Sequence, residues 1–155
     1  DDYVSGRIDD GLQGFMPKGS ESWAMLRDLL VDTGTITDPV IRQDAMRIYS
    51  WQQIARFTSL RANAQAEAGK VAGPEVSLGK LASTRAMRAW RDLTLRALGS
   101  QGMLNGPDGA LDGRITQIGL SVSGMSIAGG TDEIQRNIVG EQVLGLPREP
   151  RAPTN

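Results

Sequence analysis

The sequence predicts an all-α fold, an up-and-down bundle of about four helices. The first observation is a set of long segments with few helix breakers, in which apolar residues recur at helical spacing. The second is that Gly- and Pro-containing connections separate them, as between antiparallel neighbours in bundles. The third is length: 155 residues suffice for one domain that buries roughly 70% of its unfolded surface. The expected helices are residues 20–33, 39–68, 74–98 and 131–144.

The first helix is expected to begin at Ser20, a good N-cap, and to end at Gly34. The second has the clearest start, because Asp38 can cap it and Pro39 sits at the first helical position, where its missing donor costs nothing. Apolar residues of the second helix spread over more than one face, namely Ile41, Ile48, Trp51, Ile54, Phe57 and Leu60. This pattern predicts a helix in the middle of the bundle with only one narrow wet stripe.

The third helix is expected to open at Pro74 and to reach Leu98. Its expected apolar stripe consists of Leu78, Leu81, Ala82, Ala89 and Leu93. Residues 103–113 have the composition of a loop. Residues 115–127 are ambiguous, because their apolar spacing fits a helix whereas residues 120–123 alternate like a strand. We expect a helical turn followed by an extended loop there.

The last helix follows the pair Gly129-Gly130. Thr131 is its expected N-cap, and Asp132 and Glu133 place negative charge in the first turn, where the helix dipole favours it. The helix is expected to reach about Leu144.

These elements divide the chain into three parts. Residues 1–19 are expected to be a loop or frayed start left from a preceding domain, 20–146 a helical-bundle domain, and 147–155 a Pro-rich tail. The chain opens on Asp1 rather than Met, which suggests an excised fragment.

Composition excludes several chemistries within the chain. There is no cysteine and no histidine, so the sequence predicts no disulfide, no metal site and no Ser-His-Asp arrangement. The formal net charge of −1 does not favour nucleic acid or an anionic membrane as a partner. No apolar run approaches the roughly 20 residues of a membrane span, and no secretory signal is visible, so a cytoplasmic location is the default expectation.

Taken alone, residue patterns name no function. Gly129-Gly130 before a capped helix start is either an anion site or simply a turn into the helix, and the second is the more common case. Three tryptophans, Trp23, Trp51 and Trp90, are either a ligand surface or core and interface anchors. Acidic residues near the start, including Asp1 and Asp2, are either a cation site or a solvated end.

Residues 129–149, GGTDEIQRNIVGEQVLGLPRE, resemble the terminal helix of acyl-CoA dehydrogenases, which reads Gly-Thr-x-x-Ile-Gln-Arg-x-Ile and closes in many bacterial members on Leu-Gly-Leu-Pro-Arg. The matching residues are Gly130, Thr131, Ile134, Gln135, Arg136, Ile138, Leu144, Gly145, Leu146, Pro147 and Arg148. Weaker similarity extends upstream through Asp38-Pro39, the Lys80 region and residues 98–102. The resemblance covers most of the chain, strongly at its end.

The resemblance implies the carboxy-terminal helical domain of an FAD-dependent acyl-CoA dehydrogenase. Members of this family oxidise an acyl-CoA thioester at its α and β carbons, with a glutamate as base and a flavoprotein as electron acceptor. They oligomerise through the bundle, as homo- or hetero-oligomers. Carried over by position, Gly130, Thr131 and Glu133 would lie at the flavin, and Ser100 would approach the FAD of a neighbouring subunit.

The departures from the family pattern concern the base. The usual catalytic glutamate immediately precedes the Gly-Thr pair, and Gly129 occupies that position, so the catalytic residue is unknown. The arginine that reaches the partner's FAD has no clear counterpart among residues 31–37.

Three explanations are open: a base at another position near or before the chain's start (Asp2 is a remote candidate), a catalytically complete partner subunit, or loss of dehydrogenation. The alternative from another class is a non-catalytic scaffolding or oligomerisation bundle. The fragment alone is expected to be inactive.

Overall fold

The chain folds into helices only, within the part that the computed structural model describes, residues 19–69, 73 and 76–148. The α-helices are α2 (Gly19–Asp32), α3 (Pro39–Glu67), α4 (Val76–Leu98), α5 (Arg114–Met125) and α6 (Asp132–Ile138). Short 3-10 helices span Thr35–Thr37, Gly99–Met103 and Gly106–Asp108, and a π-helical turn spans Val139–Val143. The predicted all-α fold is confirmed.

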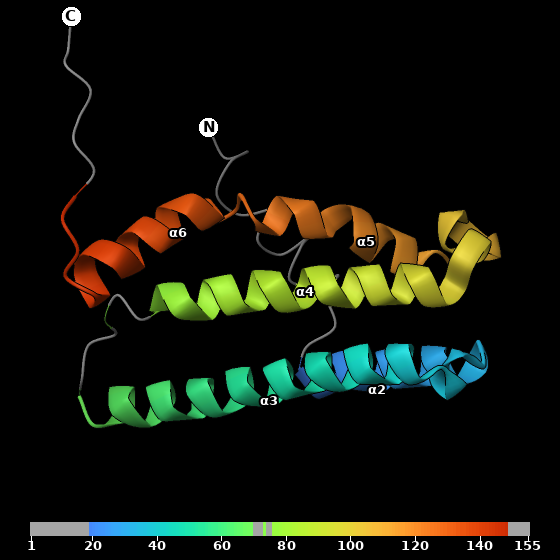
Figure 1. The fold of residues 1–155 in the computed structure, drawn as a ribbon, viewed down its shortest axis with the longest axis horizontal. Helices are drawn as coiled ribbons and strands as arrows, with labels where there is room; N and C mark the ends of the chain where they lie inside the picture. The colour runs from blue at the N-terminus through green and yellow to red at the C-terminus, as the bar shows by residue number, and fades with distance from the viewer. Residues whose placement is uncertain (1–18, 70–72, 74–75, 149–155) are drawn as a thin grey trace, which may run out of the picture.

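The arrangement is an up-and-down bundle whose fourth helix is broken. Helices α2, α3 and α4 run antiparallel in succession, and α5 and α6 then follow one another in the same direction along α4 (Figure 1). Helix α4 is central, since it contacts α2, α3, α5 and α6. The predicted four-helix pattern therefore holds, with α5 and α6 sharing the fourth position.

One prediction about the fourth position was wrong. Residues 115–127 were expected to form a helical turn followed by an extended loop, but α5 is a regular helix over Arg114–Met125. Its buried residues Ile115, Ile118 and Val122 recur every three to four positions, and this period dominates the short alternation of residues 120–123. The residues that follow α5 form turns, in which the N–H groups of Ile127 and Ala128 donate to the Gly124 carbonyl.

Two expected helix starts can be checked against the structure. Asp38 caps α3 as predicted, because its Oδ1 accepts the backbone N–H groups of Val40 at 2.7 Å and Ile41 at 3.2 Å. Helix α2 begins at Gly19, so Ser20 lies inside the helix and is not its N-cap. Of the expected loop over residues 1–19, residues 1–18 lie outside the described residues, and Gly19 is the first residue of α2. Residues 149–155 of the expected tail over 147–155 also lie outside, as does Pro74.

The apolar core lies towards one end of the bundle. It consists of Leu26, Leu29 and Leu30 of α2, Ile41, Ala45 and Ile48 of α3, Trp90, Leu93, Ala97 and Leu98 of α4, and Ile115, Ile118 and Val122 of α5. The Trp90 side chain is fully buried, and its indole N–H donates to the Ser22 carbonyl at 3.2 Å. Of the stripe predicted for the third helix only Leu93 is in this core, because the buried face of α4 runs through Trp90, Leu93 and Ala97 instead.

The second half of α3 is exposed, against the prediction of one narrow wet stripe. Ile54 and Phe57 are each 60% exposed and Leu60 is 53% exposed. Only the first half of α3 contributes residues to the apolar core, so these three apolar side chains lie outside it. Val76 and Leu78 at the start of α4 are also exposed, and these five residues form what we call the apolar end.

The other tryptophans are structural contacts in this chain. Trp23 lies against Tyr49 with ring centroids 4.8 Å apart, and the Arg85 guanidinium stacks over Trp51 at 4.6 Å from the ring centroid. No helix within the described ranges is long and apolar enough to cross a bilayer.

Candidate functional site

The break in the fourth helix forms a short loop, residues 126–131, which we call the α5–α6 loop. Ser126 is the C-cap of α5, and Thr131 is the N-cap of α6. Gly129 and Gly130 have φ of 67° and 92°, a region that glycine adopts without strain and other residues rarely adopt. The two glycines therefore turn the chain from one half of the broken helix into the other.

Hydrogen bonds close the loop at its base and order its interior. The backbone N–H of Asp132 donates to the Ser126 carbonyl at 3.1 Å. The Thr131 hydroxyl accepts the N–H of Ile134 at 3.3 Å, which confirms the predicted cap. The Gln135 side-chain Nε2 donates to the Gly129 carbonyl at 2.7 Å. The loop is thus a defined structure with its tip at residues 127–129.

Asp132 is the charged centre of this region. It is only 4% exposed, and its Oδ1 accepts from Lys80 Nζ at 2.7 Å while its Oδ2 lies 3.2 Å from Arg88 Nη2. Lys80 Nζ also donates to the Ser126 carbonyl at 3.3 Å, and Arg88 donates to the Ser126 hydroxyl. The hydrogen bond from Lys80 is the main cause that lowers the pKa of Asp132 below its ordinary 3.8.

The loop leaves backbone donors free. Within the described residues, the N–H groups of Gly129, Gly130 and Thr131 donate to no protein acceptor. A Cβ built on Gly129 would meet no atom within 4 Å, so the tip is open, whereas a Cβ on Gly130 would lie 2.9 Å from Gln135 Nε2. Gly129 is exposed, and Gly130 and Thr131 are partly exposed. Successive free N–H donors of this kind suit a ligand that carries acceptor atoms, as a flavin ring does.

Glu133 lies on the exposed side of the same helix start. It pairs with Arg136 at 3.3 Å, and both side chains are largely exposed. The pKa of Glu133 is lowered below its ordinary 4.5, first by its own backbone N–H and then by the Thr131 hydroxyl. Both carboxylates are already paired with cations, Asp132 with Lys80 and Arg88 and Glu133 with Arg136, so neither stands free beside the loop.

Ser100 lies far from the α5–α6 loop. It is exposed in the 3-10 helix Gly99–Met103, which follows the end of α4, whereas Lys80 at the start of α4 contacts the loop. At 1.5 Å per residue, the path along α4 from Lys80 to Ser100 is roughly 30 Å. Gly130, Thr131 and Glu133 are thus brought together, and Ser100 is not. One chain therefore presents two separate candidate surfaces.

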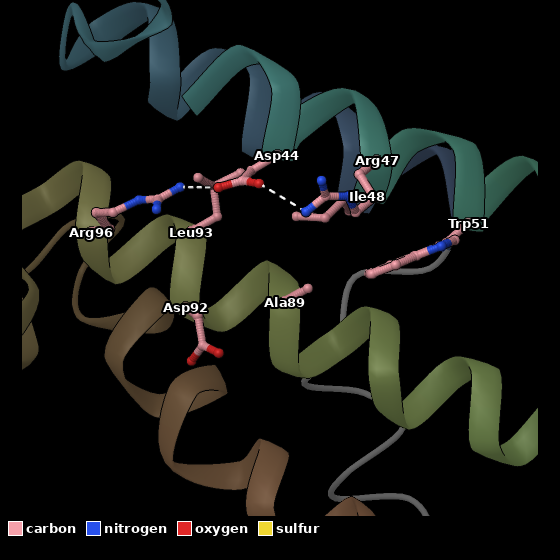
Figure 2. A pocket seen from close by; sticks show the side chains of 8 residues that line it. All are labelled: Asp44, Arg47, Ile48, Trp51, Ala89, Asp92, Leu93 and Arg96. Carbon is pink, nitrogen blue, oxygen red and sulfur yellow. Dashed lines mark hydrogen bonds and ion pairs between the residues drawn. The ribbon is translucent and has the colours of Figure 1, made fainter. Parts of the chain in front are cut away.

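A second concave region lies between α3 and α4 and is shown in Figure 2. Its wall carries Asp44, which pairs with Arg47 at 3.1 Å and also with Arg96 on the facing helix. Asp44, Arg47 and Arg96 therefore pair with one another rather than facing a ligand, and Trp51 lies at one end of the groove. The groove has the features of a helix–helix contact, so the α5–α6 loop is the better candidate site.

Sequence reasoning missed two residues of the site, Lys80 and Arg88. Lys80 is 52 residues from Asp132, and no local spacing connects them. The only sequence signal for Lys80 was the weak family similarity of its region, and that similarity did not indicate Asp132 as its ion-pair partner. Asp132 was expected to act through the helix dipole, and its contacts with α4 come from the tertiary structure.

Comparisons with known proteins agree with this fold. Residues 20–144 match the family model described as "Acyl-CoA dehydrogenase, C-terminal domain". The chain is 35% identical over 130 residues to acyl-CoA dehydrogenase IpdE1 of Mycobacterium tuberculosis, covering 80% of this chain and 31% of that protein. It is 28% identical over 135 residues to acyl-CoA dehydrogenase FadE26 of the same organism, covering 83% and 34%. The chain thus spans about a third of the length of these relatives.

Solved structures share the fold at low identity. The Tcur3481-Tcur3483 steroid ACAD superimposes with a TM-score of 0.74 at 21% identity, covering 94% of this chain and 39% of that one. The ChsE4-ChsE5 complex from Mycobacterium tuberculosis gives a TM-score of 0.70 at 20% identity, covering 92% and 40%. The family match over residues 20–144 carries the conclusion: the chain belongs to the acyl-CoA dehydrogenase family and contains its C-terminal helical domain.

Proposed function

We propose that this chain is the C-terminal domain of an FAD-dependent acyl-CoA dehydrogenase and that it supplies flavin contacts and an oligomer interface. The observation that carries the proposal is the α5–α6 loop, which is closed at its base, has an open tip and leaves the N–H donors of Gly129, Gly130 and Thr131 free. In this proposal Gly130 and Thr131 of the loop and Glu133 of α6 contact the flavin, and Ser100 contacts a flavin held by a neighbouring subunit.

The bound flavin would supply the hydride acceptor for α,β-dehydrogenation of an acyl-CoA thioester. The chain's own part is positional. The N–H groups of Gly130 and Thr131 donate to acceptor atoms of the cofactor, and the two positive-φ glycines let the backbone approach it without a side chain in between. An electron-transfer flavoprotein-type protein is the proposed acceptor of the electrons.

The catalytic base must come from outside the α5–α6 loop. Gly129 has no side chain, and Asp132 and Glu133 are engaged in ion pairs with Lys80, Arg88 and Arg136. Three explanations remain open: a base at another position near or before the start of the chain, a base supplied by a partner subunit, or loss of dehydrogenation. The printed titles of two solved structures of this fold each name two proteins, which supports a hetero-oligomer as one form of the assembly.

The apolar end is the proposed interface. Ile54, Phe57 and Leu60 of the second half of α3, and Val76 and Leu78 at the start of α4, all expose apolar side chains. Exposed apolar groups of this number indicate a surface that another domain or subunit covers. The 155-residue chain alone is therefore expected to bind no stoichiometric FAD and to be inactive.

The test uses the protein at its natural length, mixed anaerobically with a panel of acyl-CoA thioesters while the flavin absorption band is recorded. Bleaching shows that a base is present despite Gly129. The variant Gly129→Glu places a carboxylate at the open tip, and Gly129→Ala is its control, since both carry the same backbone strain. If the wild type binds FAD without bleaching, bleaching by Gly129→Glu alone would show that only the base was missing; general bases contribute about 100- to 10,000-fold in rate.

A second candidate function is a non-catalytic subunit or scaffolding bundle, which the glycine at position 129 favours. It predicts a natural-length protein without flavin and without affinity for acyl-CoA. A yellow purified protein with a flavin absorption band would exclude the scaffold. FAD that never bleaches until a partner subunit is added would instead favour a subunit of a hetero-oligomer.

A further inference from the structure

We infer that Lys80 is a positioning residue, which clamps both ends of the α5–α6 loop and so sets where Gly129, Gly130 and Thr131 stand. The inference rests on the proposed function in that it takes FAD as the ligand of the loop, whereas the clamp itself rests on the geometry of the contacts alone. One ammonium group reaches the Ser126 carbonyl at 3.3 Å and Asp132 Oδ1 at 2.7 Å. Ser126 and Asp132 are the two residues at which the loop leaves α5 and enters α6.

A second cation on the same helix repeats this pattern. Arg88 donates to the Ser126 hydroxyl and lies 3.2 Å from Asp132 Oδ2. Both ends of the loop are thus tied to α4 by two side chains that stand two helical turns apart. Lys80 is the less exposed of the two, with 20% of its side chain accessible against 44% for Arg88.

The polar clamp takes the place of apolar packing in this part of the bundle. The apolar core draws on α2, α3, α4 and α5, and no described residue of α6 belongs to it. The buried residues of α6 are Asp132 and Gln135, whereas Ile134 is 51% exposed. Helix α6 and the loop before it therefore meet α4 through charged contacts outside the apolar core, and loss of the clamp should move them without unfolding that core.

The loop itself has little other support. Ile127 is 69% exposed, and Ala128 and Gly129 are also exposed. The Gln135 bond to Gly129 is internal to the loop and α6, so it orders the loop's shape but does not fix its place on α4. A loop that moves by about 1 Å relative to a reacting group can lower a rate about 100-fold, so the position of the clamp matters for the reaction.

The experiment compares Lys80→Met with Arg96→Met in the natural-length protein. Both variants remove one cation of α4 that is paired with an aspartate on another helix, but Arg96 pairs with Asp44 at the far end of α4. Hydrogen exchange of residues 126–134 and FAD retention after gel filtration are measured for each. In Lys80→Met, the backbone amides of this segment should exchange at least about tenfold faster, and FAD should bind about tenfold more weakly, as is typical of residues that act on a ligand without touching it. Arg96→Met should change neither the exchange nor the FAD retention.

Two further variants keep the test decisive. Lys80→Arg retains a cation with several donors and should restore most of the FAD retention, whereas a merely space-filling role would not distinguish Arg from Met in this way. If Lys80→Met does not fold, Asp132→Asn removes the charge on the same link while preserving side-chain shape, and should shift both readouts in the same direction.

The outcomes separate the clamp from the proposed function. Unchanged exchange in Lys80→Met overturns the clamp whether or not FAD is bound. Faster exchange with unchanged FAD retention overturns the positioning role but leaves the proposed function standing. A wild type that binds no FAD overturns the proposed function, and the exchange data then still decide whether Lys80 holds the loop.

Discussion

Substitution of Gly130 by alanine is expected to destabilise the chain more than the same change at Gly129. Gly130 has φ of 92°, and its added Cβ would lie 2.9 Å from Gln135 Nε2. That nitrogen donates to the Gly129 carbonyl at 2.7 Å, so the methyl group displaces the Gln135 side chain and breaks the bond. The left-handed backbone costs about 1–2 kcal/mol for a non-glycine residue, and the lost bond about 1 kcal/mol. The sum is about 2–3 kcal/mol.

Gly129→Ala is the matched control. Its φ of 67° is also positive and strains a non-glycine residue, but its Cβ would meet no atom within 4 Å. The expected cost is therefore about 1–2 kcal/mol, and the two variants should differ by about 1 kcal/mol because only one of them breaks the bond. For a domain of this size, that difference corresponds to roughly 2–4 °C in Tm.

Urea unfolding of the 155-residue chain measures the difference as a shift in midpoint at constant slope. The same comparison in a Gln135→Ala background should abolish it, since the bond at stake is then already missing. Equal midpoints for Gly130→Ala and Gly129→Ala would refute the role given to the Gln135 bond. A difference that survives in the Gln135→Ala background would place the cost in the backbone at position 130 instead.

Three further predictions concern Asp132, Trp90 and Phe57. Lys80 is the main cause that lowers the pKa of Asp132 below 3.8, so the stability that Asp132 contributes is present above that pH and is lost as the pH falls through the lowered value. Urea midpoints should therefore fall more steeply below pH 3.8 in wild type than in Lys80→Met, and an equal fall in both proteins would contradict the pairing. Trp90→Ala should lower the free energy of unfolding by about 3–5 kcal/mol, because removal of a fully buried side chain leaves a cavity. Trp51→Ala, at a half-buried site, should lower it clearly less, and calorimetric unfolding of both variants measures the difference. Phe57→Ser should change the stability of the isolated chain by no more than about 0.5 kcal/mol, because this ring is 60% exposed. It should weaken self-association of the natural-length protein, measured by sedimentation. Loss of stability without loss of association would show that Phe57 packs within its own chain and not at an interface.

Local signals predicted the helices well where capping chemistry was present. Asp38 and Pro39 fixed the start of α3, and Thr131 fixed the start of α6, because a side-chain oxygen that accepts a helix N–H acts within three residues. Residues 115–127 lacked such a signal at either end. There the structure has glycine at the N-cap, Gly113, without any side-chain cap bond, so pattern alone had to decide.

Burial was harder to predict than helicity. The apolar residues of the second half of α3 have the same composition as core residues, and sequence alone does not say whether the surface that covers them is in the same chain. The candidate site shows the same limit from the polar side. Gly130, Thr131 and Glu133 form one short segment and could be predicted together, whereas Lys80 meets Asp132 only because α4 packs beside α6.

The absence of a carboxylate at position 129 is not forced by packing. A Cβ there would meet nothing within 4 Å, so the loop has room for a longer side chain, and the only obstacle is the backbone angle of 67°. Strain of about 1–2 kcal/mol is small enough for the surrounding clamp and cap to maintain. A glutamate could therefore be accommodated at this tip, and its replacement by glycine removes chemistry while leaving the loop, its free N–H donors and its Lys80 clamp intact. That combination supports the proposal that this loop contacts a flavin although the base is supplied from elsewhere.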